Sequence, residues 1–249
     1  MKKKVLTGLF VLHAMACSTQ TAANILKTAQ SFLNIPYRAG TLEQPGQEQL
    51  VTNLEAMDCW TFVEQSLALA QAQASGRPWT GHLQSLRYRN GHIDGYGSRI
   101  HYFLEWVMQA ESNGYLSDMT RSFGGVPYQK IVSYMSRFPE KYPQLAEKGA
   151  LEAVLEAESR INSRSWFYIP ASNIAAMEHR LTDGDIVATT AVHPLLDVTH
   201  QGFIVKKNGR AYLLHASSRA GKVVVSDRPL AEYVGGNADQ SGILVLRLE

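Results

Sequence analysis

One cysteine stands where the sequence predicts the start of a helix. Cys59 follows Asp58, whose carboxylate can accept the free N–H groups of a first helical turn. A buried face is predicted by apolar residues at helical spacing: Phe62, Val63, Leu67 and Ala70. We expect the thiol to ionise more easily there, because the helix dipole favours negative charge and the thiolate is the reactive form. The alternative is a small buried hydrophobic residue, as most free cysteines are.

Two histidines are brought together by a predicted β-hairpin. The Asn-Gly pair at 208–209 is favoured in a two-residue type I′ turn. In that register Gly202 lies opposite His215, and His200 lies two residues earlier on the same face. Gly202 leaves room for an imidazole. We therefore expect His200 and His215 to be diagonal neighbours, unless a longer or bulged loop shifts the register.

These three side chains predict nucleophilic catalysis. Cys59 is the candidate nucleophile, one histidine the base, and the other histidine the group that fixes the tautomer of that base. Each histidine taken alone is more often an ordinary surface or core residue. The predicted proximity of the two histidines is what makes the catalytic interpretation specific.

The composition is typical of a soluble globular protein. The chain has 249 residues, of which 45% are hydrophobic and 18% charged, and this length allows one large domain or two small ones. A net charge of +2, with no basic run beyond the N-terminus, gives no indication of nucleic-acid binding. The sequence has no Cys-x-x-Cys or His-Glu-x-x-His motif, so we expect no metal and no cofactor.

The positioning elements are mainly helices in the first half and strands in the second half. No linker separates the halves, which predicts one α+β unit with helices packed on an antiparallel sheet. Strands are predicted at 185–190, 202–207, 210–216, 222–226 and 242–248.

The N-terminus is typical of an export signal. Three lysines at 2–4 precede an apolar run at 5–16 that is too short to span a bilayer. Cys17 follows small residues and resembles the lipidated cysteine of a bacterial lipoprotein, while Ala14-x-Ala16 also fits ordinary signal cleavage. Both alternatives predict an exported, periplasmic protein, and lipidation would add a membrane anchor. Cys59 then has no intramolecular disulfide partner.

The motifs around these residues resemble the NlpC-type family of papain-like cysteine peptidases, which act on bacterial cell-wall peptides. In that family an Asp-Cys step opens the central helix, as at 58–59 here. The base begins a His-x-Gly-aliphatic strand, as at 200–204, and the third residue lies in an aliphatic-His-Ala-Ser context, as at 214–217. The Gly-Asp-Ile-Val at 184–187 and the Pro-Tyr at 36–37 also match. The resemblance implies a papain-like fold.

A large extra segment, about 79–181, resembles the amidase branch of this family. Its members share Gly-Tyr-x-Ser-Arg-x-His-Tyr, as at 95–102, Asp-Cys-x-Thr-Phe-Val-Glu, as at 58–64, and Thr-Leu-Glu, as at 41–43. The resemblance implies a single amidase domain over 18–249 after a signal at 1–17. It also implies an N-acetylmuramoyl-L-alanine amidase that cuts between the muramyl lactyl group and L-alanine in muropeptides, including anhydro forms.

A mechanism and a set of substrate contacts follow from this resemblance. His200 is expected to take the Cys59 proton, His215 to orient His200, and the Cys59 N–H to donate to the oxyanion. Arg99 has two interpretations, a partner for a stem-peptide carboxylate or a local salt bridge. Asp58 either caps the helix only or also contacts substrate. The candidate substrate-binding residues are Tyr37, Asp58, Ser98, Arg99, His101 and Tyr102.

Three other functions stay open at the level of sequence. A γ-D-glutamyl-diamino-acid endopeptidase would cut another bond of the same stem peptide. A metal-dependent amidase would use His193, Asp197 and His200 as ligands, although Pro194 and the loop context do not fix them on one face. A non-catalytic lipoprotein would only bind wall fragments, and it would not need to retain the cysteine and both histidines.

Overall fold

The computed structural model describes residues 24–249 and is built on one eight-stranded sheet. Its strands run in the order β2-β3-β8-β4-β5-β6-β7, and β1 also pairs with β8. All of the pairings are antiparallel. The signal predicted at 1–17, with Cys17, lies outside the described residues.

The five strands predicted from the sequence form the main part of this sheet, which confirms the α+β class. They are β4 (Ile186–Ala191), β5 (Val198–Lys207), β6 (Arg210–Ser217), β7 (Lys222–Val225) and β8 (Gln240–Leu248). Successive side chains alternate between the two faces of a strand, so each face of the sheet has its own apolar core.

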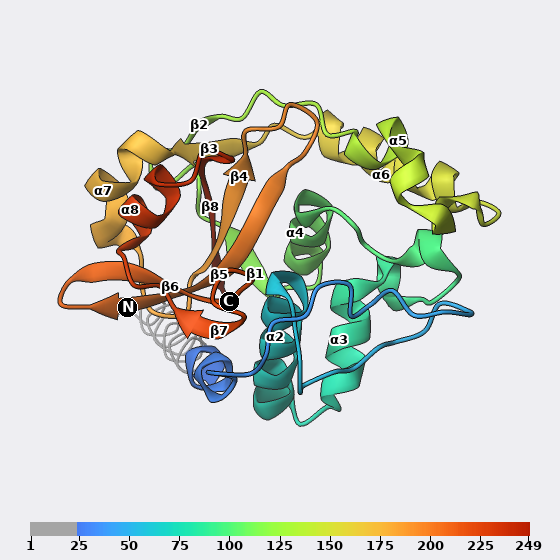
Figure 1. The fold of residues 1–249 in the computed structure, drawn as a ribbon, viewed down its shortest axis with the longest axis horizontal. Coiled ribbons are helices and arrows are strands. Elements are labelled where there is room, and N and C mark those ends of the chain that lie inside the picture. The colour runs from blue at the N-terminus through green and yellow to red at the C-terminus, as the bar shows by residue number, and fades with distance from the viewer. Residues whose placement is uncertain (1–23) are drawn as a thin grey trace, which may run out of the picture.

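One face of the sheet is covered by the longer helices (Figure 1). Phe62 of α2 packs edge-on against Phe203 of β5, with ring centroids 5.5 Å apart, in the larger core cluster. The helices that contribute to this cluster are the helical residues 24–31, α2 (Cys59–Ser75), α3 (Trp79–Arg87), α4 (Phe103–Ser112) and α6 (Ala150–Ser163).

The opposite face is covered by two short helices. Ile174 of α7 (Ile174–Met177) and Leu230 of α8 (Leu230–Gly235) are fully buried in a second core cluster with Ile204 and Leu213 of the sheet. None of the helices in the part of the chain that the structure describes is long and apolar enough to cross a membrane.

The segment predicted as an insertion is partly built into the sheet. Its three strands are β1 (Leu116–Asp118), β2 (Val126–Pro127) and β3 (Phe167–Pro170). β1 and β3 both pair with β8, through Leu116↔Leu248 and Ile169↔Ile243. The prediction that the sheet comes from the C-terminal half alone is therefore wrong, because β1 and β3 extend it.

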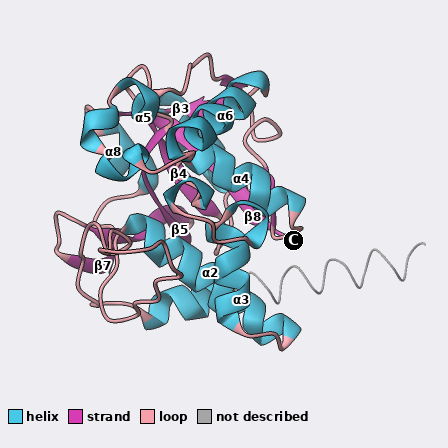
Figure 2. Cartoon of the chain, turned by 90° about the vertical axis from the view of Figure 1, so that its right-hand side faces the viewer, coloured by secondary structure: helices cyan, strands magenta, loops and turns pink. Residues whose placement is uncertain are grey.

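The part of the insertion between β2 and β3 lies above α4 (Figure 2). It includes α5 (Tyr134–Arg137) next to α6. Single 3-10 turns complete the described elements: Arg89–Gly91, Tyr96–Ser98, Pro139–Lys141, Pro143–Ala146, Ala171–Asn173 and Glu178–Arg180.

Candidate active site

The start of α2 is fixed by a capping box. The Asp58 carboxylate accepts hydrogen bonds from the Thr61 N–H at 2.8 Å and the Thr61 hydroxyl at 2.9 Å. The Thr61 hydroxyl in turn lies 3.0 Å from the Asp58 N–H, so both side chains satisfy backbone groups that the helix leaves free. The predicted cap is confirmed, and Cys59 is the first residue of the helix.

The Cys59 thiol is held by backbone N–H groups but is not ionised. The backbone of Cys59, of Trp60 and of Gln201 hydrogen-bonds the sulfur, and each bond favours the thiolate. Burial and the neighbouring Asp58 carboxylate outweigh them and raise the pKa of the thiol to about 12. The expectation of an easily ionised thiol is therefore wrong for the resting protein. Burial destabilises the thiolate more than the backbone N–H groups at the helix start stabilise it.

The hairpin has the register predicted from its turn. Asn208 and Gly209 both have positive φ, 50° and 79°, as a type I′ turn requires. Lys207 pairs with Arg210, and Phe203 pairs with Leu214, so the next opposed pair along the strands is Gly202 and His215. A Cβ placed on Gly202 would lie 2.9 Å from the His215 Cβ, and only glycine fits there.

The two histidines form a direct hydrogen bond, as predicted. His200 Nε2 lies 2.6 Å from His215 Nδ1, and the rings meet edge to face with centroids 4.8 Å apart. This bond occupies Nε2 of His200 and leaves its Nδ1 for another partner. Gln201, the next residue, hydrogen-bonds the thiol through its backbone, so the strand that carries His200 passes directly beside Cys59.

Neither histidine carries a charge at neutral pH. Burial lowers the pKa of His200 to about 4. Burial and the charge of protonated His200 lower the pKa of His215 to about 3. At neutral pH the resting protein therefore has a neutral thiol at Cys59 and a neutral imidazole pair at His200 and His215.

This arrangement predicts an activity that persists into acid. A base must be neutral to accept a proton, so activity is lost as pH falls through the pKa of His200. We expect the acid limb of kcat/KM to have its midpoint at about 4 instead of the ordinary 6.5. The measurement is a pH–rate profile, with circular dichroism at each pH to exclude acid unfolding. A midpoint near 6.5 would contradict the burial of this pair.

Tyr233 of α8 belongs to the same group and was not identified from the sequence. Its ring centroid lies 5.3 Å from that of His215 and 6.4 Å from that of His200. Burial, and after it the electrostatic interaction with Cys59, raise the pKa of its phenol. α8 follows a proline and is one and a half turns long, so no periodicity signals it. A cleft of about 880 Å³ is lined by His200, His215 and Tyr233.

Tyr37 also lies near Cys59. Its backbone bridges to Met57, the residue before the capping Asp58, and its N–H donates to the Gly221 carbonyl at 2.8 Å. Burial, Cys59 and Asp58 together raise the pKa of its phenol. The structure thus brings Tyr37 and Asp58 to the thiol.

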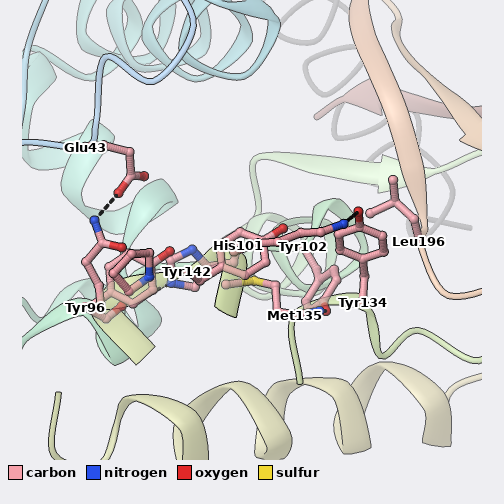
Figure 3. A pocket seen from close by; sticks show the side chains of 11 residues that line it. Glu43, Tyr96, His101, Tyr102, Tyr134, Met135, Tyr142 and Leu196 are labelled. Carbon is pink, nitrogen blue, oxygen red and sulfur yellow. Dashed lines mark hydrogen bonds between the residues drawn. The ribbon is translucent and has the colours of Figure 1, made fainter. Parts of the chain in front are cut away.

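Some residues of the Gly-Tyr-x-Ser-Arg-x-His-Tyr motif line a second pocket, and others make structural contacts next to it. His101 and Tyr102 line a pocket of about 380 Å³ (Figure 3). Ser98 instead makes local bonds, donating to the Gly95 carbonyl and accepting the Asp94 N–H.

Arg99 of this motif is buried in an ion pair. Its guanidinium donates to Glu43 at 2.8 Å and to the Leu42 carbonyl at 3.0 Å, and Glu48 lies 3.8 Å away. Only 2% of Arg99 is exposed. Of the two interpretations that the sequence left open, the salt bridge is the arrangement present in the structure.

Glu64, at the end of the Asp-Cys-x-Thr-Phe-Val-Glu motif, has a buried partner that the sequence did not reveal. Its carboxylate accepts a hydrogen bond from Arg87 of α3 at 2.8 Å, and 1% of each side chain is exposed. Arg87 also donates to the Val51 carbonyl at 2.5 Å. This buried pair fixes α2, and with it Cys59, against its neighbours.

The side chains of the metal-dependent alternative do not converge. The Asp197 carboxylate accepts the Leu104 N–H at 3.0 Å at the start of α4, and burial raises its pKa to about 6. His193 packs against the ring of Tyr134, with centroids 5.0 Å apart. Across residues 24–249 no group of three His, Cys, Asp or Glu side chains has the geometry to hold a metal ion.

Comparisons with known proteins relate most of the chain to amidase-like proteins. The family model described as AmiA-like, N-acetylmuramoyl-L-alanine amidase-like, matches residues 27–243. A crystal structure of an N-acetylmuramoyl-L-alanine amidase from Bacteroides uniformis is 36% identical, with a TM-score of 0.87 over 92% of this chain and 99% of that one. No curated protein sequence matches the chain.

Two further solved structures share the fold. A Bacteroides fragilis protein proposed to be a xylanase is 35% identical, with a TM-score of 0.82 over 89% of this chain and 99% of that one. A Legionella pneumophila protein is 21% identical, with a TM-score of 0.73 over 92% of this chain and 89% of that one, and shows similarity of fold alone.

Proposed function

Because the chain belongs to the AmiA-like, N-acetylmuramoyl-L-alanine amidase-like family, we propose that it hydrolyses the lactyl–L-alanine amide of peptidoglycan fragments with Cys59 as nucleophile. The supporting observation is a thiol at a helix start that the backbone of Gln201 hydrogen-bonds, next in the chain to a histidine whose Nε2 is bound by a second histidine. Nucleophile, base and orienting group are the three parts that such catalysis needs.

The proposed reaction proceeds through a thioester. His200 Nδ1 takes the Cys59 proton while the sulfur attacks the lactyl carbonyl carbon. The oxyanion accepts the Cys59 backbone N–H, and a preorganised donor of this kind is typically worth ~3 kcal/mol. The imidazolium then protonates the alanine nitrogen, the C–N bond breaks, and the peptide leaves. Water, deprotonated by His200, cleaves the thioester and restores the thiol.

Two tyrosines and one aspartate complete the proposal. Tyr37 and Tyr233 both lie close enough to Cys59 to interact with its charge, and either phenol is suited to donate to the oxyanion or line the lactyl subsite. The Asp58 carboxylate oxygen that is not used by Thr61 is available to the substrate, although a muramyl substrate presents no free L-alanine amine there.

The wider classification extends the proposal. The order Cys, His, His along the chain fits an NlpC-type, papain-like enzyme. A wall substrate fits export to the periplasm by the N-terminal signal, and Cys17 is then the site of lipid attachment.

His215 is expected to act by orienting His200. Replacing His215 with alanine removes the partner of His200 Nε2 and is expected to lower kcat by ~10²-fold or more with little change in KM. His215→Gln keeps a side-chain acceptor and is expected to recover part of that loss. Both variants remove a buried ring, so equal thermal stability with unequal kcat separates orientation from packing. Equal kcat in the two variants would contradict the orienting role.

The products identify the bond that is cut. Mass spectrometry of disaccharide-tetrapeptide and its anhydro form after incubation with the protein is expected to show free tetrapeptide and disaccharide. Disaccharide-dipeptide would instead indicate the γ-D-glutamyl endopeptidase, and loss of activity with a chelator a metal-dependent amidase. No product from either substrate would indicate a binding protein, and reducing sugar released from xylan would indicate a glycosidase.

A further inference from the structure

The second pocket lies between the Gly95–Tyr102 motif and the insertion. One wall carries Tyr96, His101 and Tyr102, and the other carries Tyr134 and Lys141. Figure 3 shows the pocket as a trough, with Glu43 at one end and Leu196 of the β4–β5 loop at the other. Its volume of about 380 Å³ is within the range of small-ligand sites.

The two ends of this trough carry opposite charges. At the Leu196 end, the Lys141 ammonium donates to the Tyr134 hydroxyl at 2.7 Å and lies 4.8 Å from that ring and 4.6 Å from the ring of Phe138. The two aromatic faces hold the ammonium in place and leave its other protons free for a ligand.

At the far end, Glu43 presents a carboxylate. Arg99 and Gln144 each take one of its oxygens, yet 46% of the side chain stays exposed. Glu48 also lies near Arg99, so two carboxylates, those of Glu43 and Glu48, face one guanidinium. The net charge at this end of the trough is therefore negative. Between the ends the side chains are neutral: burial lowers the pKa of His101 to about 3 and raises that of Tyr96 to about 12.

The trough adjoins the catalytic cleft. The Tyr134 ring of the trough packs against His193, which lines the cleft of His200 and His215. His200 lies four residues after Leu196, and four extended residues span at most ~14 Å. An elongated substrate attacked at Cys59 therefore reaches the Lys141 end of the trough first and the Glu43 end second.

From this order of charges we propose that the trough binds the stem peptide of the muropeptide. Lys141 holds the free α-carboxylate of the γ-linked second residue, and Glu43 holds the side-chain amine of a diamino third residue. Carboxylate then amine is the order in which these groups occur outward from the scissile bond. The assignment rests on the proposed function, and Arg99 positions Glu43 without touching the peptide.

Charge-altered substrates test each end separately. We expect wild type to prefer N-acetylmuramyl-L-Ala-D-glutamate over its α-carboxamide by about tenfold in kcat/KM, as for a charge-assisted hydrogen bond. Lys141→Gln is expected to reduce this preference to about one. A disaccharide-tripeptide with a free third-residue amine is expected to be preferred over its N-acetyl form, and Glu43→Gln should remove that preference. Lys148→Gln, an exposed lysine of the same segment, is the matched control.

A binding measurement tests the peptide site independently of the proposed hydrolysis. Titration of the free tripeptide into Cys59→Ala, with and without Lys141→Gln, requires no cleavage, and we expect about tenfold weaker binding with the second change. That result without hydrolysis would uphold the site and reject the proposed function. Unchanged binding and discrimination in Lys141→Gln, or loss of both in Arg228→Gln of the larger cleft, would overturn the assignment.

Discussion

Replacing Cys59 with alanine is expected to abolish turnover and leave binding of the muropeptide intact. The change removes the group that attacks the amide in the proposed reaction, and losses on deleting such a residue exceed ~10⁴-fold. The hairpin, the histidine bond and both pockets do not depend on the sulfur, so the dissociation constant is expected to stay within about threefold of wild type. Single-turnover kinetics and calorimetry with disaccharide-tetrapeptide measure the two quantities.

A control is needed because the thiol is largely surrounded by protein. Thermal unfolding of Cys59→Ala should match wild type to within a few degrees, since a small side chain is replaced by one slightly smaller. Cys59→Ser keeps the size and offers a poorer nucleophile in the same place. Turnover by Cys59→Ala at a tenth of the wild-type rate or more would reject the thioester mechanism.

The second large effect is expected at Gly202, which has no side chain to take part in the reaction. An added Cβ would meet the Leu214 carbonyl oxygen at 2.5 Å and the His215 Cβ at 2.9 Å. The strands must separate or His215 must turn, and overpacking of this kind costs ~1–3 kcal/mol. We expect Gly202→Ala to unfold at lower denaturant concentration and, because a misplacement of 1 Å at a catalytic group can cost ~10²-fold, to lose activity by about that factor.

The matched control is Gly81→Ala. Gly81 lies in α3, where an added Cβ meets nothing within 4 Å and φ is not positive. Alanine is the better helix former by ~1 kcal/mol, so this variant should be as stable as wild type or slightly more so, with full activity. Full activity in Gly202→Ala would show that β5 and β6 tolerate a wider spacing and that the histidine bond is not needed in its present geometry.

Local signals predicted most of the catalytic arrangement. The Asn208-Gly209 turn sets the pairing of β5 with β6, and side chains alternate between the faces of a strand. The position of this turn was therefore enough to place His200 and His215 on one face. The cap at Asp58 located the start of α2 within one position. Five strands were found because each is an apolar run between turn residues.

What the sequence did not predict depends on long-range packing. Tyr233 reaches the histidines only because α8 folds back over the sheet, and no spacing encodes that. Glu and Arg are usually exposed, so the sequence gives no sign that Glu64 and Arg87 form a buried ion pair where α2 packs on α3. The pKa of Cys59 was predicted in the wrong direction, because the helix start is visible in the sequence and the loss of water around the thiol is not.

The pairing of β1 and β3 with β8 has a consequence for attempts to trim the protein. Cutting out residues 79–181 to obtain a minimal catalytic unit would strip both partners from one side of β8. The strand would then present a row of unpaired backbone donors and acceptors on an apolar sheet, which is the template on which chains join edge to edge. The shortened protein should therefore form oligomers or precipitate, and the enzyme has to be engineered whole.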